Sequence, residues 1–155
     1  MDPVGLAPPE LAFLRGLVSR NVRFLVVGMT GALLQGARGL TEDVDLWFED
    51  LDDPRIDEAA REVGGFYVSG FGMRPPAVAG DALGDRFDIV THMHGLDSFA
   101  EEFERSGTID LAGLELRVLP LNRIMASKRA SDRPKDRAVL PSLEAALAVL
   151  DDDSE

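Results

Sequence analysis

The chain has 155 residues, 45% of them hydrophobic and 28% charged, which is enough to bury one sizeable core. Its formal net charge of −12 would repel a phosphate backbone, so composition disfavours a polynucleotide as the primary partner. The absence of cysteine excludes disulfides, thiolate metal sites and cysteine nucleophiles.

The first half of the chain alternates helical and extended patterns that are separated by glycine and proline. Apolar residues three and four apart, preceded by proline or aspartate, indicate helices, and β-branched apolar runs indicate strands. In chain order, the expected elements are helix 8–20, strand 22–28, a short helix between Gly28 and Gly36, strand 43–49 and a helix within 52–65.

The second half continues the alternation. Segment 72–84 is rich in Gly, Pro and Ala and is predicted to be a loop, and Pro141 is expected to kink or break the last helix. The other expected elements are extended segment 65–71, strand 85–93, helix 96–107, two short strands in 108–120 around an Ala112–Gly113 turn, and helices 121–130 and 133–150 that separate near Pro134.

Helices interleaved with strands favour a mixed α/β (α+β) fold, in which a mixed central β-sheet is flanked by helices. We expect a single domain over 1–155, with a core at 22–119, C-terminal helices at 120–150 and a solvated, frayed acidic tail at 151–155. The N-terminus does not resemble a signal peptide, and no apolar run approaches the roughly 20 residues of a membrane span. We therefore expect a cytoplasmic protein without a membrane partner.

The stretch "TEDVDLWFED" places Asp43 and Asp45 one residue apart in a predicted strand. Side chains at i and i+2 share a face, so both aspartates point one way while Val44 and Leu46 point into the core. Two like charges on one face repel unless a cation neutralises them, and parallel oxygen ligands suit a hard cation such as Mg²⁺. A solvated strand face or a turn cap is the alternative interpretation.

A later strand carries another candidate acid. Asp88 in "RFDIVT" lies among β-branched and apolar residues, where an unpaired charge would be costly, so it fits a third acid on the metal side. His92 and His94 alternate after Asp88 and can share its face, which is compatible with metal ligation or with ordinary surface positions.

The run "FLVVGMTGALLQGARGLTEDVDLWFE", residues 24–49, resembles the signature of nucleotidyltransferases of the DNA polymerase beta superfold, in which a strand ends in Gly-Gly or Gly-Ser and leads to Asp-x-Asp. Within it, "GARGLTEDVDL" is similar to the AbiEii-like branch, which includes nucleotidyltransferase toxins of toxin–antitoxin systems. The resemblance continues through Asp88 and "LNRIMASKRASDRPKDRAVLPSL", similar to that branch's helical lysine followed by Arg-x-Lys/Arg-Asp, and so spans 22–143.

The resemblance implies a minimal nucleotidyltransferase fold and a set of site residues. Asp43 and Asp45 would bind two Mg²⁺ (or Mn²⁺) ions, and Asp88 would share one and help deprotonate the attacking hydroxyl. Thr41 would orient the Asp43 turn. The residues implied to contact the NTP are Gly28, Met29 and Thr30 at the triphosphate turn, and Arg38 and Lys128 as sources of positive charge.

The implied activity is transfer of an NMP group from an NTP to a hydroxyl of an acceptor that is a protein, an RNA or a small molecule, in a toxin–antitoxin system. Three positions depart from the pattern: Met29 replaces Gly or Ser, Gln35 a frequent histidine, and Val139 a second aspartate. These departures bear on nucleotide affinity more than on fold. They leave open a catalytically degenerate domain that binds a cognate protein, and an aminoglycoside-type enzyme with an acidic acceptor pocket.

Overall fold

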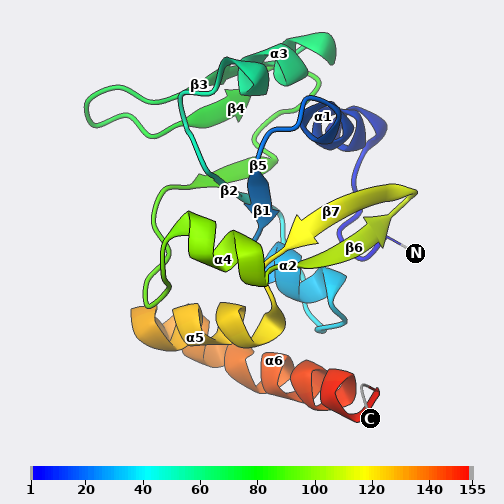
Figure 1. Cartoon of the computed structure of the whole chain (residues 1–155), viewed down its shortest axis with the longest axis vertical. Helices are drawn as coiled ribbons and strands as arrows, with labels where there is room; N and C mark the ends of the chain where they lie inside the picture. The colour runs from blue at the N-terminus through cyan, green and yellow to red at the C-terminus, as the bar shows by residue number, and fades with distance from the viewer. Residues whose placement is uncertain (1, 154–155) are drawn as a thin grey trace.

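The computed structural model describes residues 2–153, and Figure 1 shows their arrangement. The elements are α1 (Pro8–Ser19), β1 (Phe24–Val26), α2 (Gly28–Leu34), β2 (Val44–Phe48), α3 (Pro54–Glu62), β3 (Phe66–Val68), β4 (Ala77–Ala79), β5 (Phe87–Val90), α4 (Phe99–Arg105), β6 (Gly107–Leu111), β7 (Leu114–Val118), α5 (Leu121–Ser131) and α6 (Pro134–Asp153).

The main sheet has five strands in the order β5-β2-β1-β7-β6. Strand β1 is antiparallel to β2 and parallel to β7, β2 is parallel to β5, and β6 and β7 form an antiparallel hairpin. The expected mixed sheet flanked by helices is therefore confirmed. The parallel pairing of β2 with β5 places Asp45 directly opposite Asp88, although the two residues are far apart in the chain.

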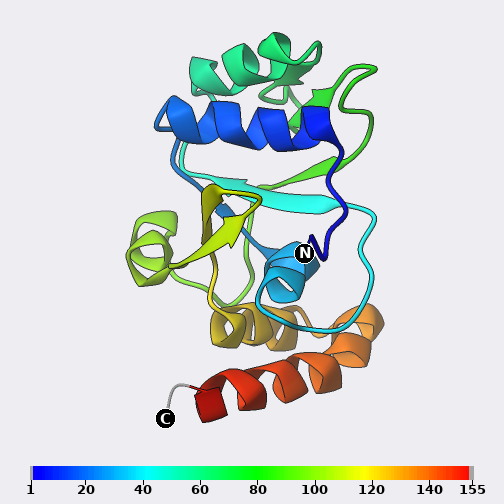
Figure 2. The ribbon, with the colours of Figure 1, turned by 90° about the vertical axis from the view of Figure 1, so that its right-hand side faces the viewer.

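Alternate residues of the central strands pack into two hydrophobic clusters, one on each face of the sheet. Val26 and Leu46 belong to the cluster that contains α1 and α3, whereas Leu25 and Trp47 belong to the cluster that contains α5 and α6. Figures 1 and 2 show these two pairs of helices at opposite ends of the molecule. Because Asp45 alternates with Leu46, it lies on the face that looks towards α5.

Gln35 connects the end of α2 to the start of α5. Its Nε2 donates to the carbonyls of Gly31 and Leu119 at 3.0 and 2.9 Å, and its Oε1 accepts from the backbone N–H of Leu121 at 3.1 Å. The amide thus satisfies one of the free N–H groups in the first turn of α5. Gln35, one of the departures from the family pattern, has a structural role here.

The structure differs from the sequence expectations at β4, which lies inside the predicted loop 72–84. Val78 is buried and pairs with Tyr67 of β3, which stabilises the strand. The strand has only three residues, so its sequence is too short to show the alternation of buried and exposed side chains that would predict it. Strands β3 and β4 form a separate two-stranded sheet.

Helix α6 also differs, because it does not end at Pro141 and continues to Asp153. Val139 and Leu140 before the proline, and Leu143 and Ala146 after it, pack in the same cluster, which offsets the backbone hydrogen bond that proline cannot donate. Residues 151–153 therefore continue the helix where we expected a frayed tail, and 154–155 lie outside the described residues. In the described part of the chain, no helix combines the length and apolar character needed to cross a membrane.

A buried ion pair attaches α4 to α5. Glu102 is fully buried, and its carboxylate accepts from Nε and Nη2 of Arg123 at 3.0 and 2.6 Å and from the backbone N–H of Asp97 at 2.9 Å. The bidentate Arg123 guanidinium is the first cause of the lowered Glu102 pKa. This pair fixes the start of α5 and therefore the wall of the cleft described below.

We predict that Glu102→Ala lowers the free energy of unfolding by about 2 kcal/mol, because it leaves the partly buried Arg123 without its partner. Urea denaturation measures the change. The control is Glu144→Ala, which removes a 3.3 Å pair with Arg129 in which both side chains are more than half exposed, and which should cost less than about 0.5 kcal/mol. Equal costs for the two variants would contradict the assignment.

Candidate active site

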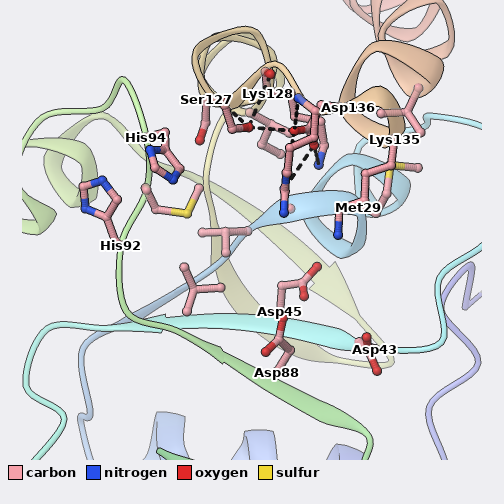
Figure 3. Close-up of a pocket in the computed structure, with 18 of the residues that line it drawn as sticks. Met29, Asp43, Asp45, Asp88, His92, His94, Ser127, Lys128, Lys135 and Asp136 are labelled. Atoms are coloured by element: carbon pink, nitrogen blue, oxygen red, sulfur yellow. Dashed lines mark hydrogen bonds and ion pairs between the residues drawn. The ribbon is translucent and has the colours of Figure 1, made fainter. Parts of the chain in front are cut away.

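A cleft of about 760 Å³ opens between the ends of β2 and β5 on one side and α5 and the start of α6 on the other. Figure 3 shows Asp43, Asp45 and Asp88 on the strands and Lys128, Lys135 and Asp136 on the facing helices. The lining also includes Gly28, Met29, Thr41, His92, His94, Ser127, Ser131, Arg133 and Val139. The cleft thus has an acidic floor and a wall that carries basic groups.

Threonine hydroxyls hold the backbone of Asp43 and Asp45 at the start of β2. The Thr30 Oγ1 of α2 donates to the Asp43 carbonyl at 2.9 Å and accepts from the Asp45 N–H at 3.1 Å. The Thr41 Oγ1 also donates to the Asp43 carbonyl, at 2.9 Å, which agrees with the expected role of Thr41 in orienting this turn. Thr30 is buried and outside the cleft lining, so its hydroxyl positions the acids from behind.

Asp45 and Asp88 form the closest contact of the acidic floor. The parallel register of β2 and β5 places them opposite each other in neighbouring strands. Burial, and then the charges of Asp88 and Asp43, raise the pKa of Asp45 to about 7, although Lys128 opposes the shift. Ionising Asp45 is therefore unfavourable in this position.

Asp43 is exposed and lies at the open end of β2, with its carboxylate apart from the other two acids (Figure 3). Within residues 2–153, no three His, Cys, Asp or Glu side chains are close enough together to hold a metal ion. The structure therefore brings two of the three predicted acids into contact and places the third on the rim of the same cleft.

Gly28 lies directly against the Asp45 carboxylate. A Cβ atom at this position would be 2.5 Å from Asp45 Oδ2, and the residue has a φ of +60°, which side-chain-bearing residues rarely adopt. Glycine is thus required both for the turn from β1 into α2 and for the space that Asp45 occupies. Met29, which follows, lines the cleft, and its Cε lies near Gly39.

The basic wall is organised around a buried acid in the first turn of α6. Asp136 is almost completely buried and accepts from Ser131 Oγ at 2.7 Å and from Arg133 Nε at 2.7 Å. Burial favours its neutral form, but the hydrogen bonds from Arg133 and Ser131 outweigh this and lower the pKa of Asp136. Lys128 Nζ lies 3.7 Å from Asp136 Oδ1, and Lys135 is exposed at the rim.

Lys128 therefore lies in the cleft, whereas Arg38 does not line it. Arg38 is exposed, and its carbonyl accepts a hydrogen bond from Ser142 Oγ of α6 at 2.6 Å. Because Arg38 lies outside the cleft lining, the expected contact between Arg38 and a phosphate stays a prediction. Arg133 and Lys135, which belong to the Arg-x-Lys/Arg-Asp run of the family resemblance, also line the cleft. The "RPKD" pattern was the signal that could have identified them.

His92 and His94 line the cleft beyond the end of β5. Their rings form an edge-to-face pair with centroids 4.6 Å apart. Figure 3 shows both rings on the loop that leaves Asp88, to one side of the acidic pair. The two histidines thus form a third side of the cleft, which is neither the acidic floor nor the basic wall.

Comparison with solved structures identifies the architecture. The crystal structure of ANT(2'')-Ia in complex with adenylyl-2''-tobramycin matches with a TM-score of 0.60 and 16% sequence identity, over 90% of this chain and 86% of that chain. The chain has a nucleotidyltransferase-like fold. A nucleotidyltransferase-like protein from Paracoccidioides brasiliensis matches with a TM-score of 0.52 and 18% identity, over 92% of this chain and 86% of that one. No protein-family model and no curated protein sequence matches the chain.

The solution structure of the antibiotic-resistance factor ANT(2'')-Ia matches as well, with a TM-score of 0.58 and 15% identity over 92% of this chain and 82% of that chain. At these identities the likeness concerns the fold. It confirms the expected nucleotidyltransferase superfold, and the assignment to the AbiEii-like branch stays a prediction.

The donor atoms of the acidic floor fit a divalent metal ion. Asp45 and Asp88 offer hard oxygen ligands, and a cation between them would relieve the repulsion that raises the Asp45 pKa. Mg²⁺ takes as few as one or two carboxylates directly, so the Asp45–Asp88 pair meets this requirement, and Asp43 lines the rim of the same cleft.

The raised Asp45 pKa predicts that Asp45→Asn stabilises the protein. The pKa is about 7 in the folded state and 3.8 in the reference state, so ionising Asp45 penalises the folded state as pH rises from 4 to 7. We expect Asp45→Asn to raise the free energy of unfolding by about 2 kcal/mol at pH 8 and to have almost no effect at pH 4. Urea denaturation across pH, in the presence of EDTA, measures both values.

The control for this prediction is Asp81→Asn, at an exposed position outside the cleft, which should change stability by less than about 0.5 kcal/mol at either pH. An Asp45→Asn variant that is no more stable than the wild type at pH 8 would show that the carboxylate is not under electrostatic strain.

We also predict that Gly28→Ala is more destabilising than Gly72→Ala. The two glycines have nearly the same φ, +60° and +61°, but a Cβ at Gly72 would meet no atom within 4 Å. Gly72→Ala should cost about 1 kcal/mol from backbone strain alone, and Gly28→Ala about 2 to 3 kcal/mol, because it also displaces Asp45. Urea denaturation decides the order, and equal costs would mean that the Asp45 contact is unimportant.

Proposed function

We propose that the protein is a metal-dependent nucleotidyltransferase that moves an NMP group from an NTP to a hydroxyl of an acceptor. The observation that carries the proposal is the cleft itself, in which the Asp45–Asp88 pair faces the basic residues of α5 and α6. A metal-bound triphosphate carries both a cationic and an anionic part, and this cleft offers each part a wall of opposite charge. The nucleotidyltransferase-like fold supports the same activity.

In the proposed reaction, the acceptor oxygen forms a bond to the α-phosphorus, the bond from that phosphorus to the β-phosphate oxygen breaks, and pyrophosphate leaves. Asp88 receives the hydroxyl proton, a role that suits its exposed position beside Asp45. Asp43, Asp45 and Asp88 would hold Mg²⁺ or Mn²⁺. Such ions would supply positive charge that offsets the negative charge developing on the transferred group.

The basic wall would hold the triphosphate. Lys128 and Arg133 are kept in place by Asp136, and Lys135 stands at the rim. Fixed cations of this kind act by positioning and electrostatics, which dominate phosphoryl transfer. Gly28 and Met29 also line the cleft, and their backbone would approach the phosphates there.

The acceptor is proposed only as a molecule that bears a hydroxyl group. The ANT(2'')-Ia complex with adenylyl-2''-tobramycin supports a small-molecule acceptor. The run "GARGLTEDVDL" supports instead the AbiEii-like branch and a toxin–antitoxin role with a protein or RNA acceptor. Among the acids of the cleft, Asp136 is already paired with basic residues, so only the floor acids could meet a cationic acceptor.

The test uses purified protein, Mg²⁺, α-³²P-labelled NTPs and a cell extract divided into protein, RNA and small-molecule fractions. We expect one fraction to become labelled, and Asp45→Asn to lower the labelling rate by at least about 100-fold. Asp81→Asn should label like the wild type. Asn at position 45 keeps the shape of the side chain, so the loss does not reflect unfolding.

Two results would reject the enzyme assignment. The first is labelling that persists in Asp45→Asn. The second is the absence of any Mg²⁺-dependent heat when NTPs are titrated into the wild type by calorimetry, which would favour the degenerate protein-binding domain that the sequence left open.

A further inference from the structure

Arg86, the residue before β5, contacts the chain on both sides of Asp43. Its carbonyl accepts from the Val44 N–H at 2.7 Å, and its Nη1 donates to the Glu42 carbonyl at 2.7 Å. One residue therefore holds the peptide groups that precede and follow Asp43. Its side chain is mostly buried, with 17% exposed.

The same guanidinium also contacts the N-terminal segment. Nη2 donates to the Val4 carbonyl, and Nε lies 3.4 Å from Glu10 Oε1 of α1. The Asp2 carboxylate accepts from the N–H groups of Val4, Gly5 and Leu6 and so shapes the turn that presents this carbonyl. The Arg86 side chain thus joins three segments that are distant in sequence.

Asp43 depends on such support more than the other acids do. Strand β2 begins at Val44, so Asp43 lies before the first residue of the ladder, and its side chain is exposed. Its direction is set by its backbone, which is held by the Thr30 and Thr41 hydroxyls at the carbonyl and by Arg86 at the flanking peptides. Asp45, by contrast, lies inside the strand and contacts Gly28 and Asp88.

We propose that Arg86 is a positioning residue that fixes the Asp43 peptide in the orientation needed for metal binding. The inference rests on the proposed function, because it assigns a role in the metal site of that reaction. Arg86 does not line the cleft, so it would act on the site through the backbone around Asp43. Groups that orient metal ligands from behind typically change metal affinity by 10- to 100-fold when mutated.

The experiment measures the Mn²⁺ and Mg²⁺ concentrations that half-saturate NTP binding, by calorimetry on the full chain. We expect Arg86→Lys to raise both concentrations by about 10-fold, because lysine cannot donate to Glu42 and Val4 with the same fork geometry. Arg86→Gln, which keeps one planar donor group, should give a similar increase. Thermal unfolding without metal checks that each variant is folded.

Two further variants separate the role in positioning from charge and from general stability. Glu10→Gln removes the charge beside Arg86 Nε but can keep its hydrogen bond to the Ala7 N–H, and should change the metal midpoint by less than about 2-fold. Arg55→Lys is the matched control, since Arg55 also donates to a backbone carbonyl, that of Arg20, and pairs with an aspartate away from the cleft. It should leave the midpoint unchanged.

The outcomes distinguish the two proposals. If the wild type shows no metal-dependent NTP binding, the proposed function fails. If the wild type binds, and Arg86→Lys and Arg86→Gln are folded with the wild-type metal midpoint, the positioning role is wrong while the function stands. A purely structural role would lower the unfolding temperature and the folded fraction without moving the midpoint. A raised midpoint, together with labelling rates that recover at saturating Mg²⁺, supports the positioning role.

Discussion

The site depends on two carboxyl groups, Asp45 and Asp88, that the sheet holds closer together than their charges favour. The parallel register of β2 and β5 pairs the two residues across the strands, and Gly28 lies against the Asp45 carboxylate. Burial and mutual repulsion together raise the Asp45 pKa to about 7, so the fold carries an electrostatic cost at neutral pH. Such a cost is typical of a site that is completed by a cation, because the same proximity that destabilises the free protein provides the ligands.

Much of this arrangement could be predicted from sequence, because it depends on local rules. The two-residue period of a strand placed Asp43 and Asp45 on the face opposite Val44, and the acid in an apolar strand identified Asp88. The alternation of helices and strands predicted the mixed sheet, which the structure confirms. The strand β4 was not predicted, and α6 does not break at Pro141, since packing from distant residues overrides local propensity there.

The rest could not be predicted, because it depends on tertiary contacts. Thr30 was expected at the triphosphate, but its hydroxyl is used behind the acids, and no local pattern distinguishes these roles. The contact between Asp45 and Asp88 requires the strand order β5-β2-β1, which sequence pattern left open. The contacts of Arg86 could not be predicted from sequence. They join it to the carbonyls of Val4 and Glu42, which are far apart in the chain and follow no sequence pattern.

A chain with a net charge of −12 can bind a polyanion only where basic groups are gathered locally. The left-handed residue Asp132 ends α5 and turns the chain, so that the first turn of α6 returns beside Lys128 and Asp136 pairs with it. The negative charge of the buried Asp136 thus stabilises the positive charges of Lys128 and Arg133 in the basic wall. A metal ion would stabilise the negative charges of the acidic floor in the same way. In the proposed reaction, metal and triphosphate would each relieve the repulsion that the other meets in this cleft. Since linkage is reciprocal, the metal would then raise nucleotide affinity by the same factor as the nucleotide raises metal affinity.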